Sequence, residues 1–294
     1  MNSGSIWEVF KAAIKNLGVN KIPKLGASLA YYTVFSMAPM LIVLISLAGI
    51  FLGQEAAEGE VYKQLSGFMG DDTAAQLEKM IRNASLAGKS NLAAIIGGVT
   101  LLVGATTIFA EIQDSINSIW GVKVRPKRNW LKMLRTRLLS FSVIISLGFL
   151  LLVSLAVSAI VDALGEALQS RFPGIAIPIF YVVNMGLTFI IATLIFGVIF
   201  KVLPDAVIRW KDVWAGSIGT AVLFMLGKFA ISFYISRSNI GTTYGAAGFL
   251  IIFLVWVYYS SIVLYFGASF TKQYALARGF AIQPREYAVR TSGS

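Results

Sequence analysis

The sequence predicts an all-α, polytopic membrane protein with six transmembrane helices and both termini in the cytoplasm. Of its 294 residues, 57% are hydrophobic and only 13% are charged, whereas a soluble domain carries about 25% charged residues. The apolar residues form long continuous runs and lack the strict alternation of barrel strands. The chain therefore has too few charges to cover a soluble surface, and we assign it to the membrane class.

Six apolar runs are long enough to cross a bilayer, which takes about 20 residues. They span residues 28–52, 92–109, 138–161, 178–203, 213–235 and 248–270. The second run is expected to continue as a helix to Trp120, beyond the hydrocarbon. These runs define a membrane domain at 25–277, preceded by a cytoplasmic segment at 1–24 and followed by a cytoplasmic tail at 278–294.

The lysines and arginines give the orientation. Eighteen of them lie in the N-terminal segment, the second and fourth connections and the tail, against six on the opposite side. The positive-inside rule then places both termini in the cytoplasm. The net charge of +11 is explained by this topology and by contact with anionic lipid headgroups. The basic loops contain no interleaved aromatic residue beyond Trp130, so we expect no nucleic-acid partner.

Two amphipathic helices are predicted outside the spans. In the N-terminal stretch "SIWEVFKAAIKNLG", Ser5 and Glu8 have the spacing of a capping box. One face then carries Trp7, Phe10, Ile14 and Leu17, with Lys11 and Lys15 beside it. This helix either lies on the inner leaflet or packs beneath the bundle, and the sequence leaves both open. The other helix is expected in the external connection at 53–91, over "DDTAAQLEKMIRNASLA".

One lysine interrupts the apolar stretch "AVLFMLGKFAISFYIS" at its centre. Lys228 lies seven residues before Ile235, about 10 Å below the outer end of its helix. Its stem spans roughly 6 Å, so snorkelling would not take the ammonium fully into water. The polar residues on or near the same stripe are Ser217, Thr220, Ser232 and Ser236.

An ionisable group inside a membrane is a functional-site hypothesis by default. The stripe of Lys228 is therefore expected to face the bundle or a wet cavity. Its partner is expected to be Asn184 of the fourth span or backbone carbonyls freed near the proline of the first span. The alternative is a structural lysine that donates to helix carbonyls.

The first span supplies a candidate cavity wall. Its polar and kinking residues fall along one face: Ser28, Tyr31, Tyr32, Ser36 and Pro39. Pro39 cannot donate to the carbonyl of Phe35, so a kink is expected. A kinked, hydroxyl-lined helix suits a cavity wall, although proline kinks also occur in purely structural membrane helices.

The end of the second span carries a polar face at the predicted cytoplasmic boundary. The face holds Glu111, Asp114, Ser115 and Ser118, with Asn117 beside it. This group could serve as a gate or ion relay. The alternative is ion pairing with the basic loop at 121–137.

Four stretches resemble the YihY/BrkB family of bacterial inner-membrane proteins. They are "GASLAYYTVFSMAPMLIV", "GATTIFAEIQDSINSIWGV", "LPDAVIRWKDVWAGSIGTAVLFMLGKFAISFYI" and "YGAAGFLIIFLVWVYYSSIVLYFGASFTKQYA", and they follow the family order from about residue 25 to 277. The resemblance implies a six-helix, multi-pass protein of the bacterial cytoplasmic membrane. Some members carry an old ribonuclease BN label, others a virulence-factor label, and transport roles have been proposed.

This chain departs from the family pattern at two positions. Ser269 stands where members of this subgroup commonly have Glu in "FGAEFT", and Glu111 stands where they often have Gln. A mechanism that rests on a carboxylate at position 269 is therefore not expected in this protein.

The residue inventory argues against catalysis. The chain contains no Cys and no His, which excludes a thiol nucleophile, a Ser/His/Asp triad and a His-rich zinc site. We therefore expect no enzyme activity, ribonuclease included, no cofactor and no metal site.

Two function classes remain. The first is a transporter of a lipid, a small anionic solute or an ion, with a polar cavity near Lys228, because a fixed cation in apolar walls suits an anionic group. The second is a membrane scaffold that supports envelope integrity without transport. The sequence leaves open whether the protein forms a homo-oligomer.

Overall fold

The computed structural model describes residues 6–36, 91–124, 173–237 and 246–291, and single residues between 59 and 79. For most of 91–105 and 173–181 only the backbone is described. The predicted third span at 138–161 and Pro39 lie outside the described residues.

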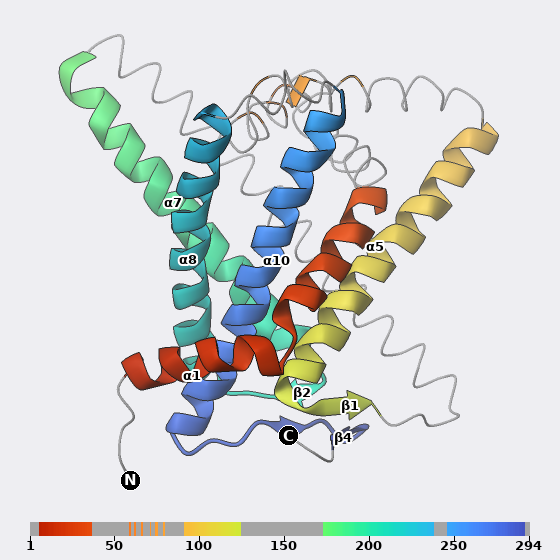
Figure 1. The fold of residues 1–294 in the computed structure, drawn as a ribbon, viewed down its shortest axis with the longest axis vertical. Helices are drawn as coiled ribbons and strands as arrows, with labels where there is room; N and C mark the ends of the chain where they lie inside the picture. Colours follow the sequence, from red (N-terminus) through yellow and green to blue (C-terminus); the bar gives the residue numbers. More distant parts are fainter. Residues whose placement is uncertain are drawn as a thin grey trace.

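The described chain is mostly helical, as predicted. α5 (Asn91–Trp120), α7 (Pro173–Val202), α8 (Trp210–Arg237) and α10 (Ala246–Ala277) run between two ends of the molecule. The helical residues 22–36, called the first upright helix below, run beside them, and α1 (Ile6–Val19) lies across one end (Figure 1). Both termini lie at this end, which we call the terminal end.

Among the described residues, three helices are long and apolar enough to cross a membrane. They are Val182–Val202, Trp210–Ile235 and Leu250–Ala277, which match the predicted fourth, fifth and sixth spans. α5 extends to Trp120, as expected from the sequence. A count of six spans remains a prediction.

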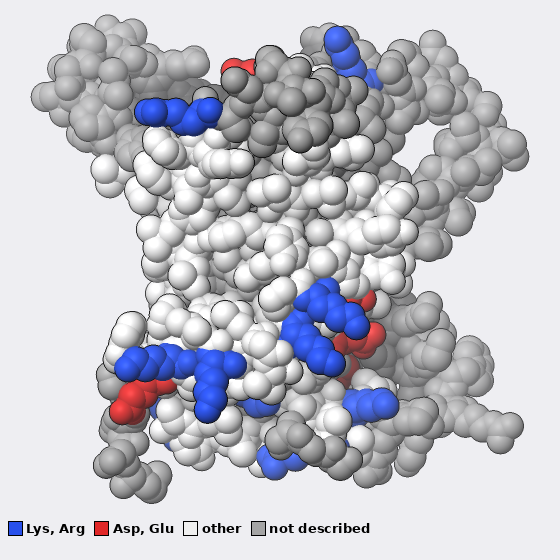
Figure 2. Space-filling view, viewed as in Figure 1, with Lys and Arg blue, Asp and Glu red and all other residues white. Residues whose placement is uncertain are grey.

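Charge is distributed as a membrane protein requires. The face seen in Figure 2 has a broad white band without charged side chains, and Lys and Arg gather below it at the terminal end. α1 contributes exposed Lys11 and Lys15 to this end. The assignment of this end to the cytoplasm rests on the positive-inside rule.

Within the described residues, four short strands modify the predicted all-α fold. β1 (Val122–Val124) pairs antiparallel with β4 (Ala288–Arg290), and β2 (Ala206–Val207) pairs with β3 (Gln283–Pro284). The tail therefore returns under the bundle and ties together the ends of α5 and α7. Strands of two or three residues are too short to show a period of two in the sequence, so the pattern could not predict them.

Two glycines allow the chain to turn after α5 and after α10. α5 and α10 are followed by Gly121 and Gly279, whose φ angles are 72° and 73°. A left-handed residue just after a helix is usually glycine, because it carries no Cβ to clash. The amide of Phe280 then donates to the carbonyl of Ala275 at 2.9 Å, which closes the end of α10.

α8 and α10 pack closely through small residues. A Cβ added at Gly216 would overlap the side chain of Thr271, and one at Gly267 would overlap Thr220. Each threonine hydroxyl donates to a carbonyl of its own helix at 2.7 Å, so neither is left unsatisfied. Small residues that let two helices approach are typical of membrane interfaces.

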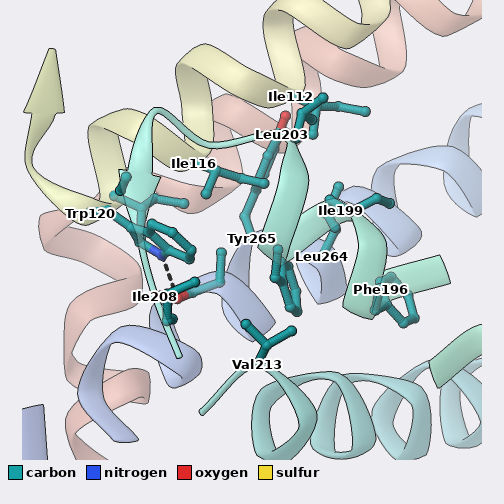
Figure 3. Close-up of a cluster of buried hydrophobic side chains, with 14 of the residues drawn as sticks. Ile112, Ile116, Trp120, Phe196, Ile199, Leu203, Ile208, Val213, Leu264 and Tyr265 are labelled. Carbon is teal, nitrogen blue, oxygen red and sulfur yellow. Dashed lines mark hydrogen bonds between the residues drawn. The ribbon is translucent and has the colours of Figure 1, made fainter. Parts of the chain in front are cut away.

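The apolar core lies near the terminal end. Figure 3 shows side chains of α5, α7, α8 and α10 that interlock there, with Tyr265 between Ile116 and Leu203. Trp120 donates through its indole nitrogen to the carbonyl of Ala268 at 2.9 Å. Lys272 donates to the carbonyl of Ile119 at 2.9 Å, which extends the contact between α5 and α10.

α1 packs beneath the bundle with one face. Val9 and Ala13 are buried, and the ring of Phe10 meets Phe266 of α10 edge-on at 5.6 Å between centroids. The structure thus supports the packed alternative for this helix, with Trp7 and Ile14 exposed on its other side.

Candidate functional site

A buried carboxylate organises the terminal end of the bundle. Asp205 follows α7 and is 2% exposed. Asn117 and Gln113 of α5 donate to its Oδ2 at 2.7 and 3.0 Å, and Tyr287 of the tail donates to its Oδ1 at 3.0 Å. We call Asp205 and these three donors the Asp205 clamp.

Backbone groups complete the clamp. The amide of Asp205 donates to Oδ1 of Asn117 at 2.8 Å, so the two side chains bond in both directions. The amide of Arg285 donates to the carbonyl of Asp205 at 3.0 Å, and its guanidinium reaches Tyr287 and the carbonyl of Val202 at 3.4 Å. α5, the α7–α8 connection and the tail therefore meet at one residue.

The clamp perturbs its neighbours electrostatically. Burial, followed by the charge of Asp205, raises the pKa of Tyr287, so the hydroxyl stays protonated and able to donate. Asp114 keeps an exposed edge, yet desolvation raises the pKa of its carboxyl, and the charges of Glu111 and Asp205 raise it further. Glu111, Asp114 and Asp205 thus form a connected acidic group.

A second buried carboxylate lies at the start of α8. Asp212 is fully buried and accepts from Arg209 at 2.8 and 3.3 Å. The guanidinium of Arg209 also lies 4.5 Å from the ring centroid of Phe280 in the tail. This pair fixes the tail beneath α8 and is best explained as structural.

Lys228 lies on α8 next to the close contact between α8 and α10. Its neighbour Gly227 is buried, and a Cβ there would overlap the ring of Tyr259, whose hydroxyl donates to the carbonyl of Leu223 at 2.6 Å. Lys228 itself is partly buried. One turn further on, the buried hydroxyl of Ser232 has no hydrogen-bond partner. Lys228 and Ser232 are four residues apart and so share one face of α8.

The other predicted cavity residues differ in their exposure. Asn184 is exposed on α7, where its carbonyl accepts from Thr188. Tyr31 and Tyr32 are exposed on the first upright helix, while Ser36 is buried against α5.

Of the predicted gate residues, Asn117 belongs to the clamp, while Glu111 and Asp114 lie beside it. The sequence reasoning missed Asp205, Gln113 and Tyr287 as members of this site. It also gave no role to Tyr265, a fully buried residue of α10. Among the described residues, no group of three or more His, Cys, Asp or Glu side chains is placed to hold a metal.

A family model described as "Virulence factor BrkB" matches residues 13–289. The chain belongs to this family. This confirms the resemblance drawn from the sequence. No solved structure matches the chain.

Curated relatives are named UPF0761 membrane proteins. One from Ralstonia nicotianae is 27% identical over 87% of this chain and 56% of its own length. One from Bordetella petrii is 28% identical over 93% of this chain and 58% of its length. One from Alteromonas mediterranea is 24% identical over 96% and 92%. The chain thus spans a little over half the length of the first two relatives and is an integral membrane protein like them.

Proposed function

We propose that this protein is a transporter of the bacterial inner membrane, which moves a lipid, a small anionic solute or an ion through a polar path beside Lys228. The observation that carries the proposal is the pair of Lys228 and Ser232. A lysine inside a helix that is apolar enough to span a membrane requires a local reason, and the adjacent hydroxyl has no partner in the structure.

A group that accepts a hydrogen bond would satisfy the hydroxyl of Ser232, since a buried hydroxyl without a partner costs about 1–3 kcal/mol. The positive charge of Lys228 would attract an anionic or phosphate-bearing substrate to the same place. We place the outer part of the transport path here because Lys228 lies in the half of α8 farther from the terminal end.

The Asp205 clamp suits the role of an inner gate for this transport path. It joins α5, the α7–α8 connection and the tail at the end that we assign to the cytoplasm, and it borders the predicted gate residues Glu111 and Asp114. Movement of α7 relative to α5 requires that these hydrogen bonds break. We therefore propose the clamp as the inner gate.

The test is flux in proteoliposomes with lipid and anion probes. Lys228→Met keeps the length of the stem and removes the charge, so it should abolish flux while the protein remains folded. Lys228→Arg keeps the charge and should retain measurable flux. A wild-type protein that moves no probe, together with envelope defects in cells lacking it, would favour the scaffold alternative.

A further inference from the structure

A strip of exposed side chains runs along the first upright helix, from the terminal end into the apolar band. Lys24, Tyr31 and Phe35 are spaced by seven and four residues and so share one face of the helix. Tyr31 is 60% and Phe35 67% exposed, and their rings lie 5.0 Å apart. Lys21 and Lys24 are exposed at the base. The strip is basic at the margin of the apolar band and aromatic within it.

α5 places two carboxylates beside this base. The two helices touch where a Cβ at Gly104 would come within 2.6 Å of Oγ of Ser36, and they run antiparallel (Figure 1). Counting along both helices from this contact, with a rise of about 1.5 Å per residue, places Asp114 level with residue 26. Asp114 is thus about 3 Å along the axis from Lys24. Glu111 lies one helical turn farther from the terminal end.

Figure 2 shows basic and acidic side chains together in this part of the surface. Blue and red side chains lie next to each other at the lower margin of the white band, over the first upright helix and α5. The base of the strip therefore presents two positive and two negative groups, with lipid-facing aromatic residues above them. A purely anionic headgroup would meet repulsion from Glu111 and Asp114.

The electrostatics of Asp114 favour a cation at this place. Burial, Glu111 and Asp205 all disfavour its ionised form. A nearby ammonium that donates hydrogen bonds would stabilise the carboxylate. The phosphate of the same molecule would meet Lys21 and Lys24, since a linker of only two carbon atoms joins the phosphate to the ammonium in an ethanolamine headgroup.

We propose that this surface binds a zwitterionic phospholipid with a primary ammonium, such as phosphatidylethanolamine. Lys21 and Lys24 hold the phosphate, Glu111 and Asp114 hold the ammonium, and an acyl chain lies along Tyr31 and Phe35. This site is separate from Lys228 and exists whether or not the protein transports lipid.

The experiment measures thermal stabilisation of delipidated, full-length protein in detergent by three phospholipids with the same acyl chains. Phosphatidylethanolamine should stabilise the wild-type protein most. Phosphatidylcholine keeps the phosphate and the positive charge but has no N–H donors, and phosphatidylglycerol has no ammonium, so both should stabilise less. Native mass spectrometry of the same samples should show a matching preference in bound lipid.

Charge variants assign the two halves of the site. Glu111→Gln with Asp114→Asn should remove the preference for phosphatidylethanolamine over phosphatidylcholine. Lys21→Gln with Lys24→Gln should weaken binding of all three lipids. Matched controls at the same end, Lys211→Gln and Glu286→Gln, alter exposed residues away from the strip and should change nothing.

Two results would overturn the proposal. Stronger stabilisation by phosphatidylglycerol that persists in the carboxylate variant would make the surface an anionic-lipid site. Equal stabilisation by all three lipids in every variant would show general lipid packing only. Neither result bears on flux through the Lys228 path.

Discussion

Removal of the Asp205 carboxylate is expected to destabilise the protein strongly. In Asp205→Ala, the side chains of Asn117, Gln113 and Tyr287 lose the acceptor that they reach at 2.7–3.0 Å. Each buried donor left without a partner costs about 1–3 kcal/mol. Asn117 is buried, whereas Gln113 and Tyr287 are partly exposed and can turn to water. We therefore expect a loss of about 2–5 kcal/mol in the free energy of unfolding.

A double-mutant cycle isolates the clamp. Tyr287→Phe removes one hydrogen bond to a charged group, which is worth about 1.5–3 kcal/mol at most. Because both changes remove the same bond, the double variant should lose less than the sum of the single variants. Glu286→Ala alters an exposed neighbour in the tail and should stay within about 0.5 kcal/mol of wild type.

The assay is unfolding of purified protein by SDS titration in mixed micelles, followed by circular dichroism. The order of stability should be wild type, Tyr287→Phe, then Asp205→Ala. If Asp205→Ala unfolds within about 0.5 kcal/mol of wild type, the clamp does not hold the three segments together and the reasoning from buried hydrogen bonds is refuted.

Three further predictions concern packing, pH and topology. Gly216→Ala should destabilise the protein by about 1–3 kcal/mol, because the added methyl group overpacks against Thr271. In the control Gly219→Ala, on the same helix, the added Cβ meets only ordinary contact at 3.7 Å, so this variant should be neutral or stabilising. Equal effects of the two variants on SDS unfolding would contradict the close packing of α8 on α10. Asp114→Asn should stabilise the protein at pH 7, since folding raises the pKa of this carboxyl and so disfavours its ionised form. The gain in stability should shrink as pH falls through the folded-state pKa, because the native carboxyl then becomes neutral as well. A gain that grows in acid would contradict the raised pKa. In a chain without native cysteine, Ser66→Cys should react with an impermeant thiol reagent in whole cells and Ser292→Cys should not; the opposite pattern would invert the topology.

The sequence predicted those features that depend on local composition. Long apolar runs identify α7, α8 and α10, and the same pattern makes Lys228 conspicuous. Asn117 could be proposed because it follows Glu111 and Asp114 along one boundary. Each of these three signals can be recognised within one helix, without knowledge of its neighbours.

The sequence could not predict features that depend on distant segments. Asp205 is separated by 88 residues from Asn117 and by 82 from Tyr287, and "LPDAV" by itself reads as a polar turn after a span. The paired strands of the tail are two or three residues long. The exposure of Tyr31 and Tyr32 also required the neighbouring helices, because a hydroxyl-bearing face can turn either inward or toward lipid.

Water access to position 232 tests the transport account most directly. Ser232→Cys would introduce the only thiol in the chain, one turn from Lys228, and Leu226→Cys on the exposed side of α8 is the matched control. If a polar path runs beside Lys228, an impermeant methanethiosulfonate reagent should modify Cys at 232 much faster than Cys at 226, where lipid excludes water. If both positions are equally unreactive in a folded protein, no wet path reaches Lys228 and the scaffold alternative would replace transport.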